Sequence, residues 1–177
     1  MKKLSFKTAF GGIISALCVV LECAVGVLPI FLYVFPMLCG LLMMILIDEC
    51  GVKTAVSAFV SISVLSLLLC SDKEAAILYV GFFGYYPIVR TYLQKIKSRV
   101  LRIVLKLLMF NAAMVCSYLI LIAVFGLEQL GLEGGAYVLL GLLAMLNVMF
   151  GAFDFILDKL VVLYRTKFRD RFFGGRR

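Results

Sequence analysis

Two acidic residues lie deep inside a long apolar stretch of this chain, in register with two other polar or small residues. Asn147, Gly151, Asp154 and Asp158 follow one another at spacings of four, three and four. Residues three or four apart share one face of an α-helix, so the spacing predicts a single polar face. An unpaired acid in lipid costs roughly 2.5–3.5 kcal/mol on insertion scales. We therefore expect this face to point into a helix bundle or toward a partner protein.

Basic partners for these acids occur at the start of the preceding apolar run. Arg102 and Lys106 are four residues apart, so they also share one helical face. We predict a structural ion-pair cluster in which these two side chains meet Asp154 and Asp158. A proton or ion path is the alternative interpretation. It is disfavoured because the outer half of the same run carries no further acid.

Glu22 is a separate ionisable residue, near the end of the first apolar run. Two interpretations stay open for it. The side chain either reaches the membrane interface or remains protonated, or else it lines an outward-facing pocket. The nearest basic residue expected on its side of the membrane is Lys73. Because Asp72 and Glu74 flank Lys73, a solvated turn is the simpler interpretation of that segment, and binding an acidic ligand is the other.

Several kinds of chemistry have no support in the sequence. It contains no GxxxxGK[ST] phosphate loop, no HExxH, no GxSxG and no histidine. Its six cysteines form no CxxC pair, and most lie in apolar runs, where a thiol behaves as a small hydrophobe. We therefore predict no enzyme activity, no metal site and no bound cofactor.

The elements that position these residues are apolar runs separated by short polar breaks. The chain has 177 residues and is 64% hydrophobic, well above the roughly 45–50% of soluble domains. Only helices and closed barrels cross lipid, and the runs show no alternation of period two, so we predict helices. The expected fold is a single all-α transmembrane domain, residues 1–177, with six spans at about 6–28, 30–47, 54–70, 75–89, 103–127 and 136–164, followed by a basic tail, 165–177.

Positive charge is distributed unequally between the two sides of this arrangement. If the breaks alternate sides, 17 of the 18 Lys and Arg residues fall with both termini, and only Lys73 falls opposite. Cytoplasmic loops carry such an excess. We expect cytoplasmic termini, a multi-pass protein of a bacterial cell membrane, and contacts of the basic residues with membrane lipid rather than nucleic acid.

Two further patterns concern helix ends. Phe82-Phe83-Gly84-Tyr85-Tyr86-Pro87 closes the fourth span, where we predict an interfacial aromatic belt and a kink or helix end. Thr8, Gly12 and Ala16 form a stripe of small residues in the first span. Such a stripe permits close helix approach. It serves either packing within the bundle or docking of a membrane partner.

This size, topology and stripe resemble the S components of energy-coupling factor (ECF) transporters. The family's Ala-x-x-x-Ala stripe would correspond to Gly12-Ile13-Ile14-Ser15-Ala16, with glycine at the first position. The resemblance implies a small-molecule cargo, held in an outward-facing pocket, and docking through the first helix onto a transmembrane T component with an ATPase pair. Segments 71–76 and 82–87 are also similar to uncharacterised membrane proteins of Gram-positive anaerobes.

Three functions follow as hypotheses. The first is a substrate-capture subunit of an energy-coupled importer of vitamin-like micronutrients, without an ATPase of its own. Its pocket would be lined by Glu22, Tyr33, Lys73, Glu74, Tyr79, Tyr118 and Tyr137, and its docking stripe would be Thr8, Gly12 and Ala16. The second is a membrane scaffold similar to the rod-shape protein MreD, with 90–106 and 165–177 as the interaction face. The third is a proton-coupled carrier that needs Glu22 or Asp154.

Overall fold

Helices make up nearly all of the chain that the structure describes. This computed structural model covers residues 2–125, 135–164 and 166, and at 2–4, 125, 135–140 and 142 it describes the backbone alone. Along the chain these residues form α1 (Lys2–Ala24), a 3-10 turn (Pro29–Phe31), α2 (Val34–Cys50), α3 (Val52–Leu69), α4 (Lys73–Leu78), a π-helical turn (Tyr79–Phe83), α5 (Tyr86–Leu93), α6 (Arg99–Phe125) and α7 (Gly135–Leu163). The described residues contain no strand, so the prediction of an all-α fold is confirmed.

Three of these helices are long and apolar enough to cross a membrane. The qualifying segments are Ser5–Ala24, Val52–Leu69 and Arg99–Val124. Large aliphatic side chains on their surfaces are exposed, including Ile13, Leu68 and Val100. Exposed apolar surface on this scale is what lipid-facing helices present. The described residues therefore form an all-α structure with three helices suited to a membrane, and six spans stay a prediction.

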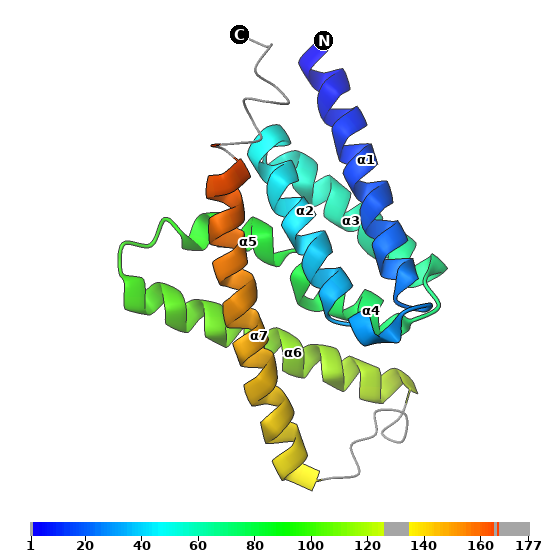
Figure 1. The fold of residues 1–177 in the computed structure, drawn as a ribbon, viewed down its shortest axis with the longest axis vertical. Coiled ribbons are helices and arrows are strands. Elements are labelled where there is room, and N and C mark those ends of the chain that lie inside the picture. The colour runs from blue at the N-terminus through cyan, green and yellow to red at the C-terminus, as the bar shows by residue number, and fades with distance from the viewer. Residues whose placement is uncertain (1, 126–134, 165, 167–177) are drawn as a thin grey trace.

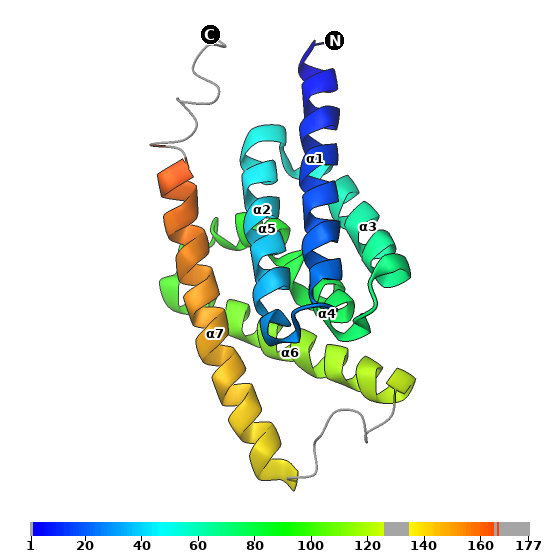
Figure 2. The same ribbon diagram turned by 45° about the vertical axis from the view of Figure 1, so that its right-hand side comes forward.

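The helices alternate between two ends of the molecule. The start of α1, the α2–α3 turn at Gly51 and the last turns of α7 lie at one end, which we call the Gly51 end (Figures 1 and 2). The α1–α2 and α3–α4 connections lie toward the other, the Asp72 end. Helix α6 does not run parallel to the others but crosses α7 at a steep angle in both views.

Local sequence explains the main breaks. Gly51 has φ +87°, a backbone conformation that side chains with a Cβ rarely adopt, and it separates α2 from α3. Asp72 caps α4, because its carboxylate accepts hydrogen bonds from the amides of Glu74 (3.0 Å) and Ala75 (3.2 Å). The expected fourth span, 75–89, is not one straight helix. Its π-helical turn ends at Gly84, and Pro87 lies in the first turn of α5.

The core is an aromatic cluster built by this bent segment, α6 and α7. Phe82 stacks on Tyr86 with ring centroids 4.7 Å apart, and Phe110 stacks on Phe150 at 4.6 Å. Phe82 and Tyr86 are wholly buried. The prediction that this aromatic run forms an interfacial belt is therefore wrong. The bend at Gly84 turns the rings inward, and a Cβ at Gly84 would approach a Phe59 ring carbon to 2.7 Å.

Candidate functional site

The interior near the Asp72 end contains an acid with no nitrogen or hydroxyl partner among the described residues. Glu22, in the last turns of α1, is 0% exposed. No N–H or O–H group of the described residues donates to its carboxylate oxygens, and the Cys39 thiol of α2 is a weak donor beside it. Its charge acts on Cys39 of α2, Cys70 after α3, and Tyr79. The interpretation in which Glu22 reaches the interface is wrong, because the side chain is enclosed. Burying a polar group without a hydrogen bond costs about 1–3 kcal/mol by protein mutational data.

Weakly bonded hydroxyl groups accompany this acid. The Tyr79 and Ser66 side chains are both 0% exposed. The Tyr79 hydroxyl has no hydrogen-bond partner among the described residues, and Ser66 meets the Cys70 thiol but no nitrogen or oxygen partner. Buried polar atoms are normally satisfied, so each exception needs an explanation. Glu22, Tyr79 and Ser66 together give this part of the bundle unused capacity to bind a polar ligand. We call them the buried polar group.

Other residues predicted to line a pocket are used differently. The Tyr33 and Tyr118 hydroxyls lie 2.6 Å apart and bond to each other. The Lys73 ammonium donates to the carbonyl oxygens of Leu67 (2.8 Å) and Cys70 (2.7 Å). Lys73 therefore caps the end of α3 instead of presenting a free cation.

Glu74 and Tyr137 complete the predicted set. The charge of Glu74 acts on both Tyr33 and Tyr118, which places all three in one region. Partial burial, and secondly the nearby Asp72 carboxylate, raises the pKa of Glu74 above its usual range. Tyr137 lies in the part of α7 whose side chains are outside the described residues. Of the predicted set, Glu22 and Tyr79 thus belong to the buried polar group. Tyr33 and Tyr118 form a pair beside Glu74, and Lys73 caps a helix.

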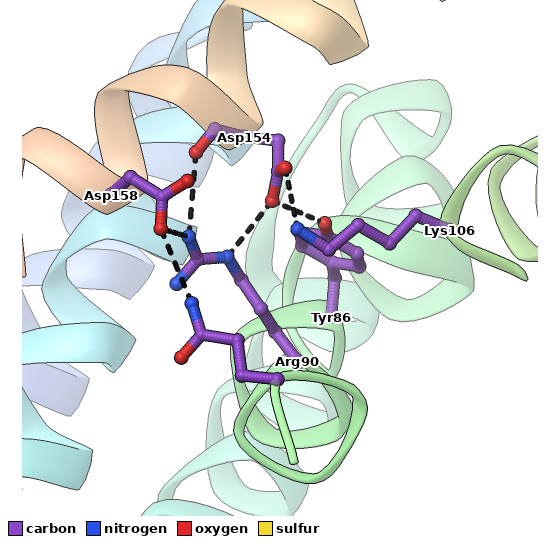
Figure 3. Close-up of polar contacts among 6 residues, drawn as sticks. Tyr86, Arg90, Lys106, Asp154 and Asp158 are labelled. Atoms are coloured by element: carbon purple, nitrogen blue, oxygen red, sulfur yellow. Dashed lines mark hydrogen bonds and ion pairs between the residues drawn. The ribbon is translucent and has the colours of Figure 1, made fainter. Parts of the chain in front are cut away.

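The acids of α7 do form an ion-pair cluster (Figure 3). Lys106 of α6 binds Asp154, with Nζ 2.6 Å from Oδ2. The predicted pairing of Arg102 with these acids is wrong among the described residues, because Arg90 of α5 takes that position. Its Nε lies 2.9 Å from Asp154 Oδ1, and its Nη2 pairs with Asp158.

Neutral side chains complete the cluster around the two acids. Tyr86 donates to Asp154 Oδ1 at 2.6 Å, and Gln94 donates to Asp158 Oδ1 at 3.2 Å. The Arg90 side chain is wholly buried, whereas that of Asp158 is 58% exposed. Asp154 thus accepts from three side chains, as a structural ion pair requires. Sequence analysis missed Arg90 and Tyr86, although their spacing of four, on one helical face, was an available signal.

A polar cavity opens beside this cluster. Its volume is about 520 Å³, and Arg99, Arg102 and Lys106 of α6 line it together with Asp154 and Asp158 of α7. Arg102 therefore faces solvent-accessible space at the edge of the cluster. Deeper in the same helix pair, Asn111 and Asn147 exchange two amide hydrogen bonds of 2.9 Å each. This pair fastens α6 to α7, as expected for helix packing.

The small-residue stripe of α1 is on the surface. Thr8, Gly12 and Ala16 are exposed, and a Cβ at Gly12 would meet nothing within 4 Å. A groove of about 410 Å³ runs between α1 and α3 at this place. Its lining is small or hydroxylic apart from one lysine, and consists of Lys7, Thr8, Gly11, Gly12, Ser15, Thr54, Ser57, Ala58 and Ser61. We call it the α1–α3 groove. Packing inside the bundle does not use Gly12.

Comparisons with known proteins give no match: no family model, no curated protein and no solved structure matches this chain. The described residues also hold no group of three or more His, Cys, Asp or Glu side chains able to bind a metal ion. Function must therefore be argued from the buried polar group, the ion-pair cluster and the α1–α3 groove.

Proposed function

We propose that this protein is the substrate-capture subunit of an energy-coupled importer, similar to the ECF S components. The observation that carries the proposal is the buried polar group. Glu22, Tyr79 and Ser66 are enclosed, and no nitrogen or oxygen atom of the described residues forms a hydrogen bond with their side-chain oxygens. Such groups are costly in a membrane protein unless they are used. A small molecule with hydrogen-bonding groups would satisfy them.

The α1–α3 groove supports the same proposal. Membrane helices associate where small residues allow their backbones to approach closely. A Cβ at Gly12 would meet nothing within 4 Å, so the groove is open to such a contact there, and it lies toward the Gly51 end, away from Glu22. A capture subunit is expected to bind its cargo at one end and to dock onto a separate ATP-driven partner at the other end.

Docking is tested by substituting Gly12 with leucine. The leucine side chain of Gly12→Leu should fill the groove without disturbing the fold of the protein, because the space around Gly12 is open. In a mild-detergent purification followed by mass spectrometry, wild type should retain a T component and an ATPase pair, and Gly12→Leu should lose them. Val20→Leu is the matched control, because Val20 is 64% exposed on the same helix outside the groove. Absence of a T component and ATPases from the wild-type purification contradicts the proposal.

Capture is tested at Glu22. Small molecules extracted from purified wild-type protein should include one that is absent from Glu22→Gln, a variant with nearly the same shape and no charge. Tyr92→Phe serves as control, because Tyr92 is 55% exposed and remote from the buried polar group in the fold. If wild type and Glu22→Gln carry the same molecules, Glu22 does not bind the cargo.

A membrane scaffold, similar to MreD, is the second candidate. The cavity of about 520 Å³ favours it, because its basic lining from α6 suits a protein partner. Lys73 and the tyrosine pair also form structural contacts, so fewer polar groups are left to bind a cargo. The double variant Arg99→Gln/Arg102→Gln distinguishes the scaffold from the capture subunit. If the protein is a scaffold, the variant should no longer retain its protein partner in purification. If it is a capture subunit, the variant should still bind the T component.

A further inference from the structure

Two thiols from different helices meet at the Asp72 end. The Sγ atoms of Cys23, in the last turn of α1, and Cys70, directly after α3, lie 2.8 Å apart. A disulfide bond has a length of about 2.05 Å. Less than about 1 Å of movement therefore separates this contact from a covalent bond. These cysteines are 47 residues apart in the sequence, so the contact depends on the fold.

The segments that carry the two thiols lie close together, because α1 packs against α3. Gly26, just after α1, is so near Ser71, the residue after Cys70, that a Cβ added at Gly26 would lie 3.4 Å from the Ser71 Cβ. Within the α3 end itself, the carbonyl oxygen of Cys70 accepts a hydrogen bond of 2.7 Å from Lys73. The close approach of the sulfurs is a property of how α1 packs beside α3.

We propose that Cys23 and Cys70 are a disulfide-forming pair that cross-links α1 to the end of α3. The oxidant is a small disulfide, RSSR, acting by thiol–disulfide exchange. The Cys23 thiolate attacks one sulfur of RSSR, and RSH leaves. The Cys70 thiolate then attacks Cys23 Sγ, forming the intramolecular S–S bond and releasing the second RSH. Two protein thiols lose two electrons and two protons, and one RSSR becomes two RSH.

Exposure fits this order of events. Cys23 is partly exposed and can meet a disulfide from solution, whereas Cys70 is buried beside it and can act only as the resolving thiol. The other cysteines differ from this pair in exposure. Cys18 and Cys39 also lie beside each other, but both are buried, and each thiol points to the other residue's carbonyl oxygen, at 4.0 and 3.5 Å. Cys116 is exposed on α6.

The bond would act directly on the buried polar group. Cys23 follows Glu22 in the chain, and the charge of Glu22 acts on Cys70. Joining these two sulfurs closes the protein between α1 and α3 at this place. The cross-link therefore sets how far α1 can separate from α3 beside Glu22. This inference does not depend on the proposed transport function, because the chemistry is that of the two thiols alone.

The experiment uses the full chain in mild detergent with oxidised glutathione as the disulfide. After oxidation and denaturation, thiols are counted with a polymer-tagged maleimide on a gel. The protein carries Cys116→Ser, which prevents cross-links between molecules, so five cysteines should react when it is reduced and three after oxidation. Peptide mass spectrometry should then find the Cys23 peptide joined to the Cys70 peptide.

Serine variants make the assignment specific. Cys70→Ser should trap the mixed disulfide of Cys23 with glutathione, and Cys23→Ser should leave Cys70 reduced, because that thiol is buried. Cys39→Ser is the matched control and should cross-link as wild type does. Thermal unfolding of each reduced variant checks that the fold is intact. The proposal is overturned if the Cys116→Ser protein keeps Cys23 and Cys70 reduced in excess oxidised glutathione, or if the cross-linked peptides contain other cysteines.

Discussion

Arg90 and Asp154 form a buried ion pair that joins α5 to α7, with 2.9 Å between Nε and Oδ1. The residues are 64 positions apart, and Lys106 of α6 binds the other oxygen of the same carboxylate. One acid therefore connects three helices. Because the Arg90 side chain is wholly enclosed, its charge depends on Asp154 and Asp158 for compensation.

Removing the charge of Asp154 should destabilise the fold strongly. Asp154→Asn leaves Arg90 and Lys106 without their shared carboxylate, and breaking a buried pair costs about 3–5 kcal/mol. The measurement is the free energy of unfolding in detergent by chemical denaturation. Asp158→Asn is the matched control. It should cost about 1 kcal/mol or less, since the Asp158 side chain is 58% exposed. Equal losses for the two variants would contradict the central position of Asp154.

Truncating Phe82 should remove the centre of the aromatic core. Its ring stacks on Tyr86 and meets Phe110 and Phe150 edge to face. Phe82→Ala should lower the free energy of unfolding by about 3–5 kcal/mol, through lost contacts and the cavity left behind. The control is Leu68→Ala, at a side chain 72% exposed on α3, which should change stability by about 0.5 kcal/mol or less. A small effect at Phe82 would place it at a lipid interface, as the sequence had suggested.

The hydrogen bond between Tyr33 and Tyr118 should be measurable by a double-mutant cycle. Each single change to phenylalanine leaves one hydroxyl without its partner, and we expect a loss of about 0.5–1.5 kcal/mol for either. The double variant removes both hydroxyls and should cost less than the sum of the single variants. Unfolding in detergent measures all three. Strict additivity would show that the two hydroxyls do not interact.

Much of the helical layout could be predicted from the sequence, because local chemistry determines it. The breaks near Gly51, Asp72 and Pro87 require only a glycine in a left-handed conformation, a helix cap and a proline. The shared face of Asp154 and Asp158 follows from helical spacing alone. Lys106 was predicted correctly as a partner of Asp154, because it lies in the apolar run that precedes the run containing Asp154.

What could not be predicted depends on how helices turn in space. Arg90 replaces Arg102 because the π-helical turn before α5 changes the direction of the chain and carries Arg90 to α7. The burial of Phe82 has the same origin. The steep crossing of α6 over α7 (Figure 2) is likewise not predicted by any periodicity in the sequence of α6. The capping role of Lys73 could not be predicted either, because it depends on carbonyl groups at the end of another helix.

Neutralising Glu22 should not destabilise the fold as neutralising Asp154 does, although the chemical change is similar. Glu22 has no cationic partner among the described residues, so Glu22→Gln breaks no ion pair and ends the burial of an ionisable group. The free energy of unfolding should stay within about 1 kcal/mol of wild type or rise. Measured beside Asp154→Asn in the same detergent, the two variants should differ by at least about 2 kcal/mol. A loss at Glu22 as large as that at Asp154 would mean that Glu22 stabilises the fold, and it would remove the reason for assigning this acid to a ligand.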